Sequence, residues 1–139
     1  MELITFQPTL AVLTNPVTSR TLMWPEYEHD LLHGGWVPPL IVSPVNRNLA
    51  QAYIILDGNH RTCLCAKHGY LVPAYLMTLK TTPDEILQLE LSEQIRPFPH
   101  RDFLLGDQSF QDLMGGAIKA ALELGETVEE ALHRIQSSE

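Results

Sequence analysis

The chain has 139 residues, of which 45% are hydrophobic, and a formal net charge of −8. This length and composition predict one globular domain with a hydrophobic core. The chain has no basic stripe, which argues against binding to extended duplex DNA, and no apolar run approaches the ~18 residues that a membrane span needs.

The first four residues lack the basic start and the apolar segment of a secretory signal. Cys63 and Cys65 are the only cysteines, and they stand two positions apart in an expected helix. Residues at that spacing point to different helix faces, so we do not expect a disulfide between them. We therefore expect a reduced, cytoplasmic protein.

The N-terminal part begins with a short apolar segment and continues into a turn-rich region. Residues 3–6 predict a strand that Pro8 ends. Residues 14–38 contain several Pro and Gly residues and predict irregular structure, with one or two helical turns at residues 27–32.

The central part predicts strands that alternate with turns and one helix. Residues 40–45 and 52–57 are expected to pair as a hairpin. The second strand continues through a glycine turn into a helix that stops at Gly69, and a strand follows within residues 72–79. We expect three or four strands in total, and a right-handed crossover that places the helix on one face of the sheet.

The last third of the chain predicts three helices. Thr82 starts a capping box, and prolines after residue 96 end that helix. Asp107 is expected to cap a second helix that Gly125 ends, and Thr127 opens the last one.

The two parts of the chain differ in charge. Residues 1–81, the expected α+β core, contain five acidic and five basic side chains, whereas residues 82–139 contain twelve acidic and four basic ones. We expect residues 82–139 to form a helical extension packed on the core as one compact domain. Its acidic helices are a candidate docking surface for a protein partner.

Five successive residues at the glycine turn indicate most of the chemistry: Asp57, Gly58, Asn59, His60 and Arg61. A glycine here allows a positive φ, so that the following amides can converge on an anion at the positive end of the helix. The arginine is a forked donor for phosphate oxygens, and the histidine titrates near neutrality. The aspartate can bind a metal, accept a proton or cap the helix.

The same five residues also suit a purely structural turn. Asp-Gly and Gly-Asn are common turn dipeptides, and Asp57 or Asn59 can satisfy the helix amides that have no partner. The pattern alone leaves both interpretations open.

Three segments, taken in order, resemble the ParB/sulfiredoxin superfamily: residues 35–42, 53–61 and 66–74. In that family a glycine-containing segment leads to a Pro-apolar-apolar-Val strand, and a second strand ends in an Asp-Gly-x-x-Arg box. A helix then leads to a Val-Pro strand. The resemblance implies a small mixed sheet in an α+β fold, with the phosphates of a nucleotide resting on the box.

Members of this family include partition proteins that hydrolyse CTP, sulfiredoxins that use ATP, and kinases that act on free serine. Sulfiredoxins have their reactive cysteine where this chain has Asn59, and partition proteins have several box arginines where this chain has one. The serine kinases have an Asp-Gly-His-x-Arg box, closer to this one in its acid and glycine, and an upstream carboxylate base. Glu26 and Glu28 are the candidates for that base.

The resemblance therefore implies binding of ATP, ADP or CTP with Mg²⁺, and phosphoryl transfer or NTP hydrolysis. Residues 58–61 would hold the phosphates, Arg61 would neutralise developing charge, and His60 would donate a hydrogen bond. Asp57 would position Mg²⁺ or accept a proton. The alternative is a non-catalytic module that binds a nucleotide or a protein, and a third possibility is a ParB-like nuclease.

Overall fold

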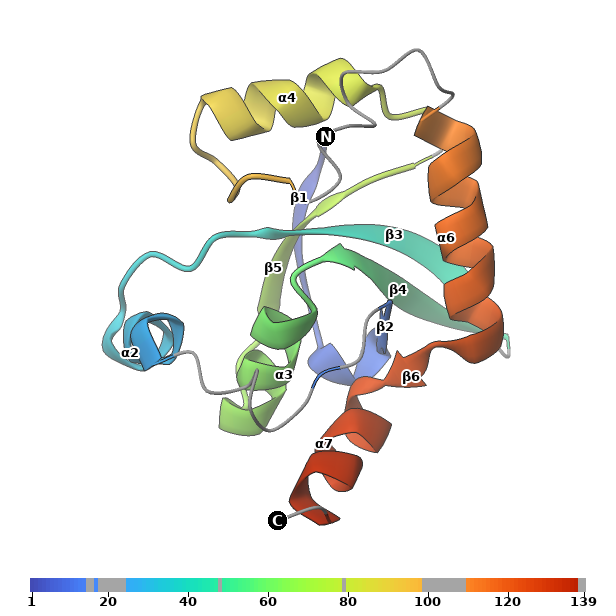
Figure 1. The fold of residues 1–139 in the computed structure, drawn as a ribbon. Coiled ribbons are helices and arrows are strands. Elements are labelled where there is room, and N and C mark those ends of the chain that lie inside the picture. The colour runs from blue at the N-terminus through green and yellow to red at the C-terminus, as the bar shows by residue number, and fades with distance from the viewer. Residues whose placement is uncertain (15–16, 18–24, 48, 79, 99–109, 138–139) are drawn as a thin grey trace.

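The computed structural model describes residues 1–14, 17, 25–47, 49–78, 80–98 and 110–137. Within this part of the chain, a six-stranded mixed sheet with strand order β1-β5-β3-β4-β2-β6 has helices on both faces (Figure 1). The strands are β1 (Leu3–Phe6), β2 (Ala11–Leu13), β3 (Leu40–Arg47), β4 (Ala50–Asp57), β5 (Val72–Leu76) and β6 (Glu126–Thr127). The helices are η1 (Pro8–Leu10), α2 (Pro25–His33), α3 (Asn59–His68), α4 (Pro83–Leu91), α6 (Phe110–Leu124) and α7 (Val128–Ser137). The predicted α+β class is confirmed.

The central hairpin is confirmed and is longer than predicted. β3 and β4 pair antiparallel, with Val42 opposite Ile55 and Val45 opposite Ala52. The register shifts between Ile41 and Val42, so that β4 contains one extra residue just before its end at Asp57. Such a bulge bends a strand and re-aims the side chains that follow it.

The connection from β4 through α3 to β5 differs from the prediction. β4 is antiparallel to β3, and β5 is parallel to β3, so β4 and β5 run in opposite directions with β3 between them. The right-handed crossover rule applies to parallel strands, and it therefore does not govern this connection. The prediction of a right-handed crossover at this connection was wrong.

The sheet also has more strands than the three or four predicted. β2 is three residues long and pairs parallel with β4, and β6 is two residues long and pairs antiparallel with β2. Such short strands give no hydrophobic period that a sequence pattern can reveal. Because β6 comes from the C-terminal third, this part of the chain contributes to the sheet as well as to the helices.

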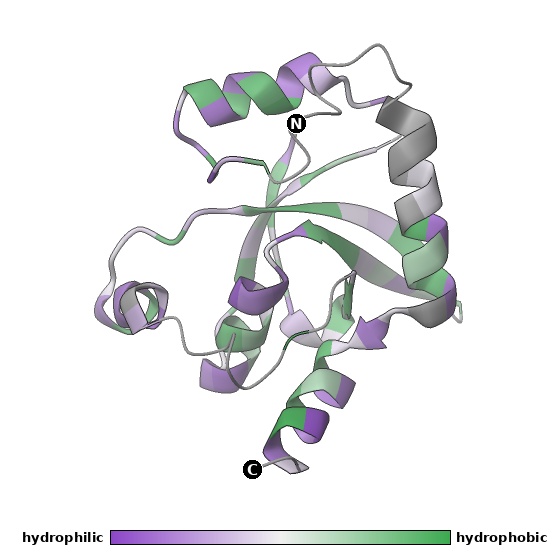
Figure 2. Ribbon diagram, viewed as in Figure 1, coloured by the Kyte–Doolittle hydropathy of each residue, from purple (hydrophilic) through white to green (hydrophobic). Residues whose placement is uncertain are grey.

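Both faces of the sheet are covered by helices. One core cluster joins the sheet to α2, α3 and α7, and it includes Val42, Ile55 and Leu64. The other joins the opposite face to α4 and α6, and it includes Ile41 and Ile54. Neighbouring residues thus alternate between the two cores, as the period of a strand requires. Figure 2 shows hydrophobic residues along the central strands and a mixture of hydrophobic and hydrophilic positions along the helices.

The C-terminal helices confirm the predicted starts at Thr82 and Thr127 and the predicted end before Gly125. The expected end at the prolines after residue 96 was wrong, because α4 already ends at Leu91, just before Glu93 takes a left-handed φ of 57°. The Thr82 hydroxyl accepts a hydrogen bond from the Glu85 amide at 3.4 Å, and the Glu85 carboxylate accepts one from the Thr82 amide at 2.8 Å, which completes the capping box. α6 ends before Gly125, and the Thr127 hydroxyl accepts from the Glu130 amide in the first turn of α7. The predicted cap at Asp107 lies outside the described residues. No helix in the described part of the chain is long and apolar enough to span a membrane.

Candidate functional site

The glycine turn (residues 57–61) joins the end of β4 to the start of α3. Gly58 is the N-cap residue, in the left-handed region with φ 110° and ψ 30°, and its carbonyl accepts the first helical hydrogen bond from the Thr62 amide at 3.0 Å. Gly58 has no side chain that could cap the first amides of α3, and the first turn of this helix contains no acidic residue. The first-turn amides of a helix have no carbonyl partner within the helix, so this end of α3 is electropositive.

Gly58 is required here by packing as well as by its backbone conformation. A Cβ at this position would overlap Cδ2 of Leu40 and would lie 3.0 Å from its Cγ and 3.2 Å from Nη2 of Arg61. The side of Gly58 that a Cβ would occupy is therefore filled by protein. A ligand could approach Gly58 only from another direction.

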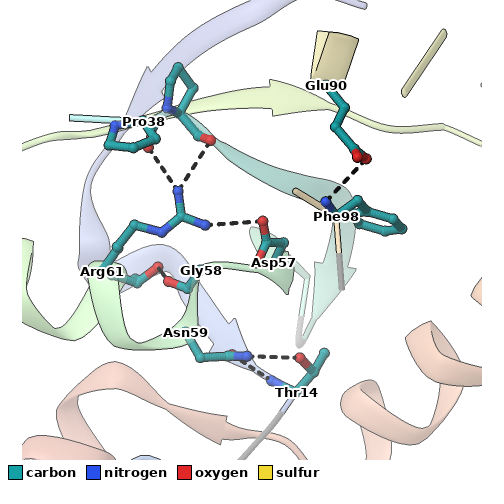
Figure 3. Close-up of polar contacts among 10 residues, drawn as sticks. Thr14, Pro38, Asp57, Gly58, Asn59, Arg61, Glu90 and Phe98 are labelled. Atoms are coloured by element: carbon teal, nitrogen blue, oxygen red, sulfur yellow. Dashed lines mark hydrogen bonds and ion pairs between the residues drawn. The ribbon is translucent and has the colours of Figure 1, made fainter. Parts of the chain in front are cut away.

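Arg61 lies inside the protein, with 3% of its surface exposed. Its Nη1 donates to the carbonyls of Pro38 at 3.0 Å and Pro39 at 3.4 Å, and its Nη2 donates to Oδ2 of Asp57 at 3.0 Å (Figure 3). The Asp57 side chain is 16% exposed, so this ion pair is mostly shielded from water. The guanidinium thus connects the segment that leads into β3 with the end of β4.

Asn59 is also buried, and its side chain contacts Thr14 at the end of β2. Oδ1 of Asn59 accepts from the Thr14 amide at 3.0 Å, and its Nδ2 donates to the Thr14 hydroxyl at 3.2 Å (Figure 3). The same hydroxyl donates to the carbonyl of Ile55 at 2.6 Å. Thr14 could not be predicted as a site residue from the sequence, because no local signal links residues 45 positions apart.

His60 lies in the first turn of α3 and is partly exposed. Burial lowers the pKa of His60, and the neighbouring positive charge of Arg61 lowers it further. The imidazole is therefore neutral at neutral pH, where one ring nitrogen donates and the other accepts. Among the side chains of residues 59–61, that of His60 is the one that is not fully buried, although its Nε2 atom is shielded from solvent.

The structure places Glu28 away from the glycine turn. Its carboxylate lies 3.7 Å from Nζ of Lys67 and 3.6 Å from Nε2 of His68, at the C-terminal end of α3. Lys67 is eight residues after Asn59 in the helix, and a rise of about 1.5 Å per residue places the two about 12 Å apart along the helix axis. The geometry therefore does not support Glu28 as a base acting at the turn. Glu26 belongs to α2, but its side chain lies outside the described residues.

Both cysteines lie on α3 and are buried and unbridged. Burial, with a smaller contribution from the Glu126 carboxylate, raises the pKa of Cys63 to about 12. Burial also raises the pKa of the Cys65 thiol. A reactive cysteine needs thiolate character and exposure, and neither residue has them.

We expect neither thiol to react with iodoacetamide at pH 8 while the protein is folded. Both should react once urea unfolds the chain, at a rate at least about 100-fold higher, because unfolding exposes the thiols and returns their pKa values to the normal range. Mass spectrometry of the labelled protein measures this difference. Rapid labelling of Cys63 in the native protein would contradict the buried position.

Among the described residues, no three His, Cys, Asp or Glu side chains come together as a metal-binding group. Mg²⁺ that is bound together with a nucleotide needs only one or two protein carboxylates, because phosphate oxygens and water complete its coordination. Asp57, at the edge of the turn, could provide one such carboxylate.

No protein-family model matches the chain, and no curated protein matches it.

Proposed function

We propose that the glycine turn binds the phosphates of a nucleotide and that the protein carries out phosphoryl transfer or NTP hydrolysis with a divalent ion. One observation carries the binding step: the N-cap of α3 is a glycine at φ 110°, which brings no capping side chain of its own, and the first turn contains no acidic residue. A helix start of this kind attracts anions through its amides and its dipole.

The side chains of the turn suit this proposal in different ways. The neutral imidazole of His60 can donate a hydrogen bond to a phosphoryl oxygen. Asp57 can contribute a carboxylate oxygen to Mg²⁺, which would reduce the charge of the phosphates. Phosphoryl transfer depends mainly on positioning and electrostatics, so a small set of residues is sufficient.

The resemblance to the ParB/sulfiredoxin superfamily supports the same function. The box residues Asp57, Gly58 and Arg61 lie together at one strand-to-helix turn. The preceding Pro38–Pro39 segment lies against this turn through Arg61. Nucleotide binding at the box is what the resemblance implies, and ATP, ADP and CTP are the candidates.

A non-catalytic nucleotide-binding module is the second candidate function. Two observations favour it: Oδ2 of Asp57 accepts a hydrogen bond from Arg61, and Glu28 pairs with residues at the far end of α3. Both carboxylates are thus engaged with cationic side chains of the protein. In this case the exposed acidic residues of α4 and α7 could serve to dock a partner protein.

We expect the protein to bind at least one of ATP, ADP and CTP in the presence of Mg²⁺, and His60→Ala to weaken that binding. Loss of a hydrogen bond to a charged phosphate should reduce the affinity about tenfold. Isothermal titration calorimetry of the wild type and the variant measures the affinity, and chromatography of the same mixtures detects product.

His133→Ala is the matched control, since His133 is an exposed helical histidine on α7. It should bind the nucleotide as the wild type does. Binding with product formation supports the enzyme, and binding without product supports the non-catalytic module. If His60→Ala and the wild type bind the nucleotide with equal affinity, His60 does not contribute to nucleotide binding.

A further inference from the structure

Arg61 connects three separate parts of the protein from the inside. Its guanidinium donates to two successive carbonyls before β3, at Pro38 and Pro39, and to the carboxylate of Asp57 at the end of β4. Its own backbone belongs to the first turn of α3. The Arg61 side chain also lies close to Gly58: a Cβ added to that glycine would be 3.2 Å from Nη2.

The two terminal nitrogens of the guanidinium are thus directed at protein acceptors. An arginine that grips a phosphate presents its planar fork to the oxygens of the ligand, as a pair of parallel donors. In this structure Nη1 and Nη2 meet carbonyl and carboxylate oxygens instead, and the residue is 3% exposed. Asp57 also balances the positive charge of Arg61, since the two groups lie 3.0 Å apart.

We infer that Arg61 is a positioning residue. It holds the glycine turn in its binding conformation through contacts in the protein interior, and it does not itself contact the anion. By tying the Pro38–Pro39 segment to the turn, it keeps Leu40 packed against Gly58 and fixes the direction of the amides at residues 59 and 60. The attraction for the anion then comes from those amides and from His60. The consequence for binding rests on the proposed function.

Lysine at position 61 tests this role, because a single ammonium cannot reproduce the planar set of donors that reaches two carbonyls and a carboxylate. Arg134→Lys is the matched control. Arg134 also joins a carbonyl, that of Val17 at 2.6 Å, to a carboxylate, that of Glu126, but it lies on α7 and both of these partners are outside the glycine turn.

Hydrogen exchange and calorimetry with MgATP, MgADP and MgCTP distinguish these variants. Arg61→Lys should speed amide exchange at residues 40–42 and 58–61 at least about tenfold, and should weaken nucleotide binding about tenfold. Arg134→Lys should change neither quantity at these residues. If Arg61→Lys does not fold, NMR of the wild-type Arg61 side chain decides: its N–H signals should stay protected and unshifted on nucleotide addition, while the amides of residues 58–60 shift.

Two results would overturn this role: an Arg61 side-chain signal that shifts with the nucleotide as much as the Gly58 amide, or unchanged exchange at residues 40–42 in Arg61→Lys. If no nucleotide binds at all, the proposed function fails. The exchange comparison between Arg61→Lys and Arg134→Lys still tests the positioning role in that case.

Discussion

Gly58→Ala should lower the free energy of unfolding by about 3 kcal/mol. A left-handed backbone costs a residue with a Cβ about 1–2 kcal/mol, and the added methyl group overpacks the site at a further cost of about 1–3 kcal/mol. Both terms apply here, because Gly58 has φ 110° and its Cβ position is occupied by Leu40. Urea denaturation followed by circular dichroism measures the loss.

Gly69→Ala separates the two contributions to that loss. Gly69, at the end of α3, also has a positive φ of 75°, but a Cβ there would meet nothing within 4 Å. This variant should lose only the conformational part, about 1 kcal/mol. Equal losses in the two variants would contradict the close packing of Leu40 on the glycine turn.

Asp57→Ala should destabilise the protein by about 3 kcal/mol, because it leaves the buried guanidinium of Arg61 without its carboxylate. The two residues should also be strongly coupled: Asp57→Ala combined with Arg61→Leu should cost clearly less than the sum of the single changes. Denaturation of the two single variants and the double variant gives this coupling energy.

Glu126→Ala provides the comparison for this ion pair. Glu126 pairs with Arg134 at 2.9 Å, but the two side chains are 31% and 43% exposed, so water screens the charges. Glu126→Ala should therefore lower the free energy of unfolding much less than Asp57→Ala does. Additive effects of the Asp57 and Arg61 substitutions would contradict the buried pair.

The Asp57–Arg61 contact also affects how activity measurements are interpreted. A loss of turnover in Asp57→Ala could arise from disturbed packing at the turn, without any catalytic role for the carboxylate. Asp57→Asn keeps an oxygen that accepts from Arg61 and removes the negative charge that Mg²⁺ requires. Turnover lost in a stably folded Asp57→Asn variant would therefore indicate a catalytic or metal-binding role.

The sequence predicted those parts of the fold that have strong local signals. Residues 3–6, the hairpin and the capping box at Thr82 have recognisable turn, period or cap residues, and all three are confirmed. β2 and β6 lack such signals because they have three and two residues, and they are strands only through their neighbours in the sheet. The reversed direction of β5 relative to β4 likewise depends on pairing with β1 and β3.

The candidate site shows the same division between local and distant contacts. Gly58 as a left-handed residue at the start of a helix was predictable from the strand, the glycine and the apolar helix that follow one another. The partners of Arg61 and Asn59 were not, because Pro38 and Thr14 are 23 and 45 positions away in the chain. Sequence patterns identify donors such as an arginine, but only the fold determines whether they face a ligand or the protein interior.

The proposed function requires the amides of the glycine turn to meet a phosphate, and a ¹H–¹⁵N NMR titration of the protein with MgATP and MgCTP tests this most directly. We expect the largest shifts at the amides of residues 58–61 with at least one of them, and no such shifts with adenosine or cytidine, which lack phosphate. Shifts confined to other parts of a folded protein, or no shifts with either nucleotide, would contradict it.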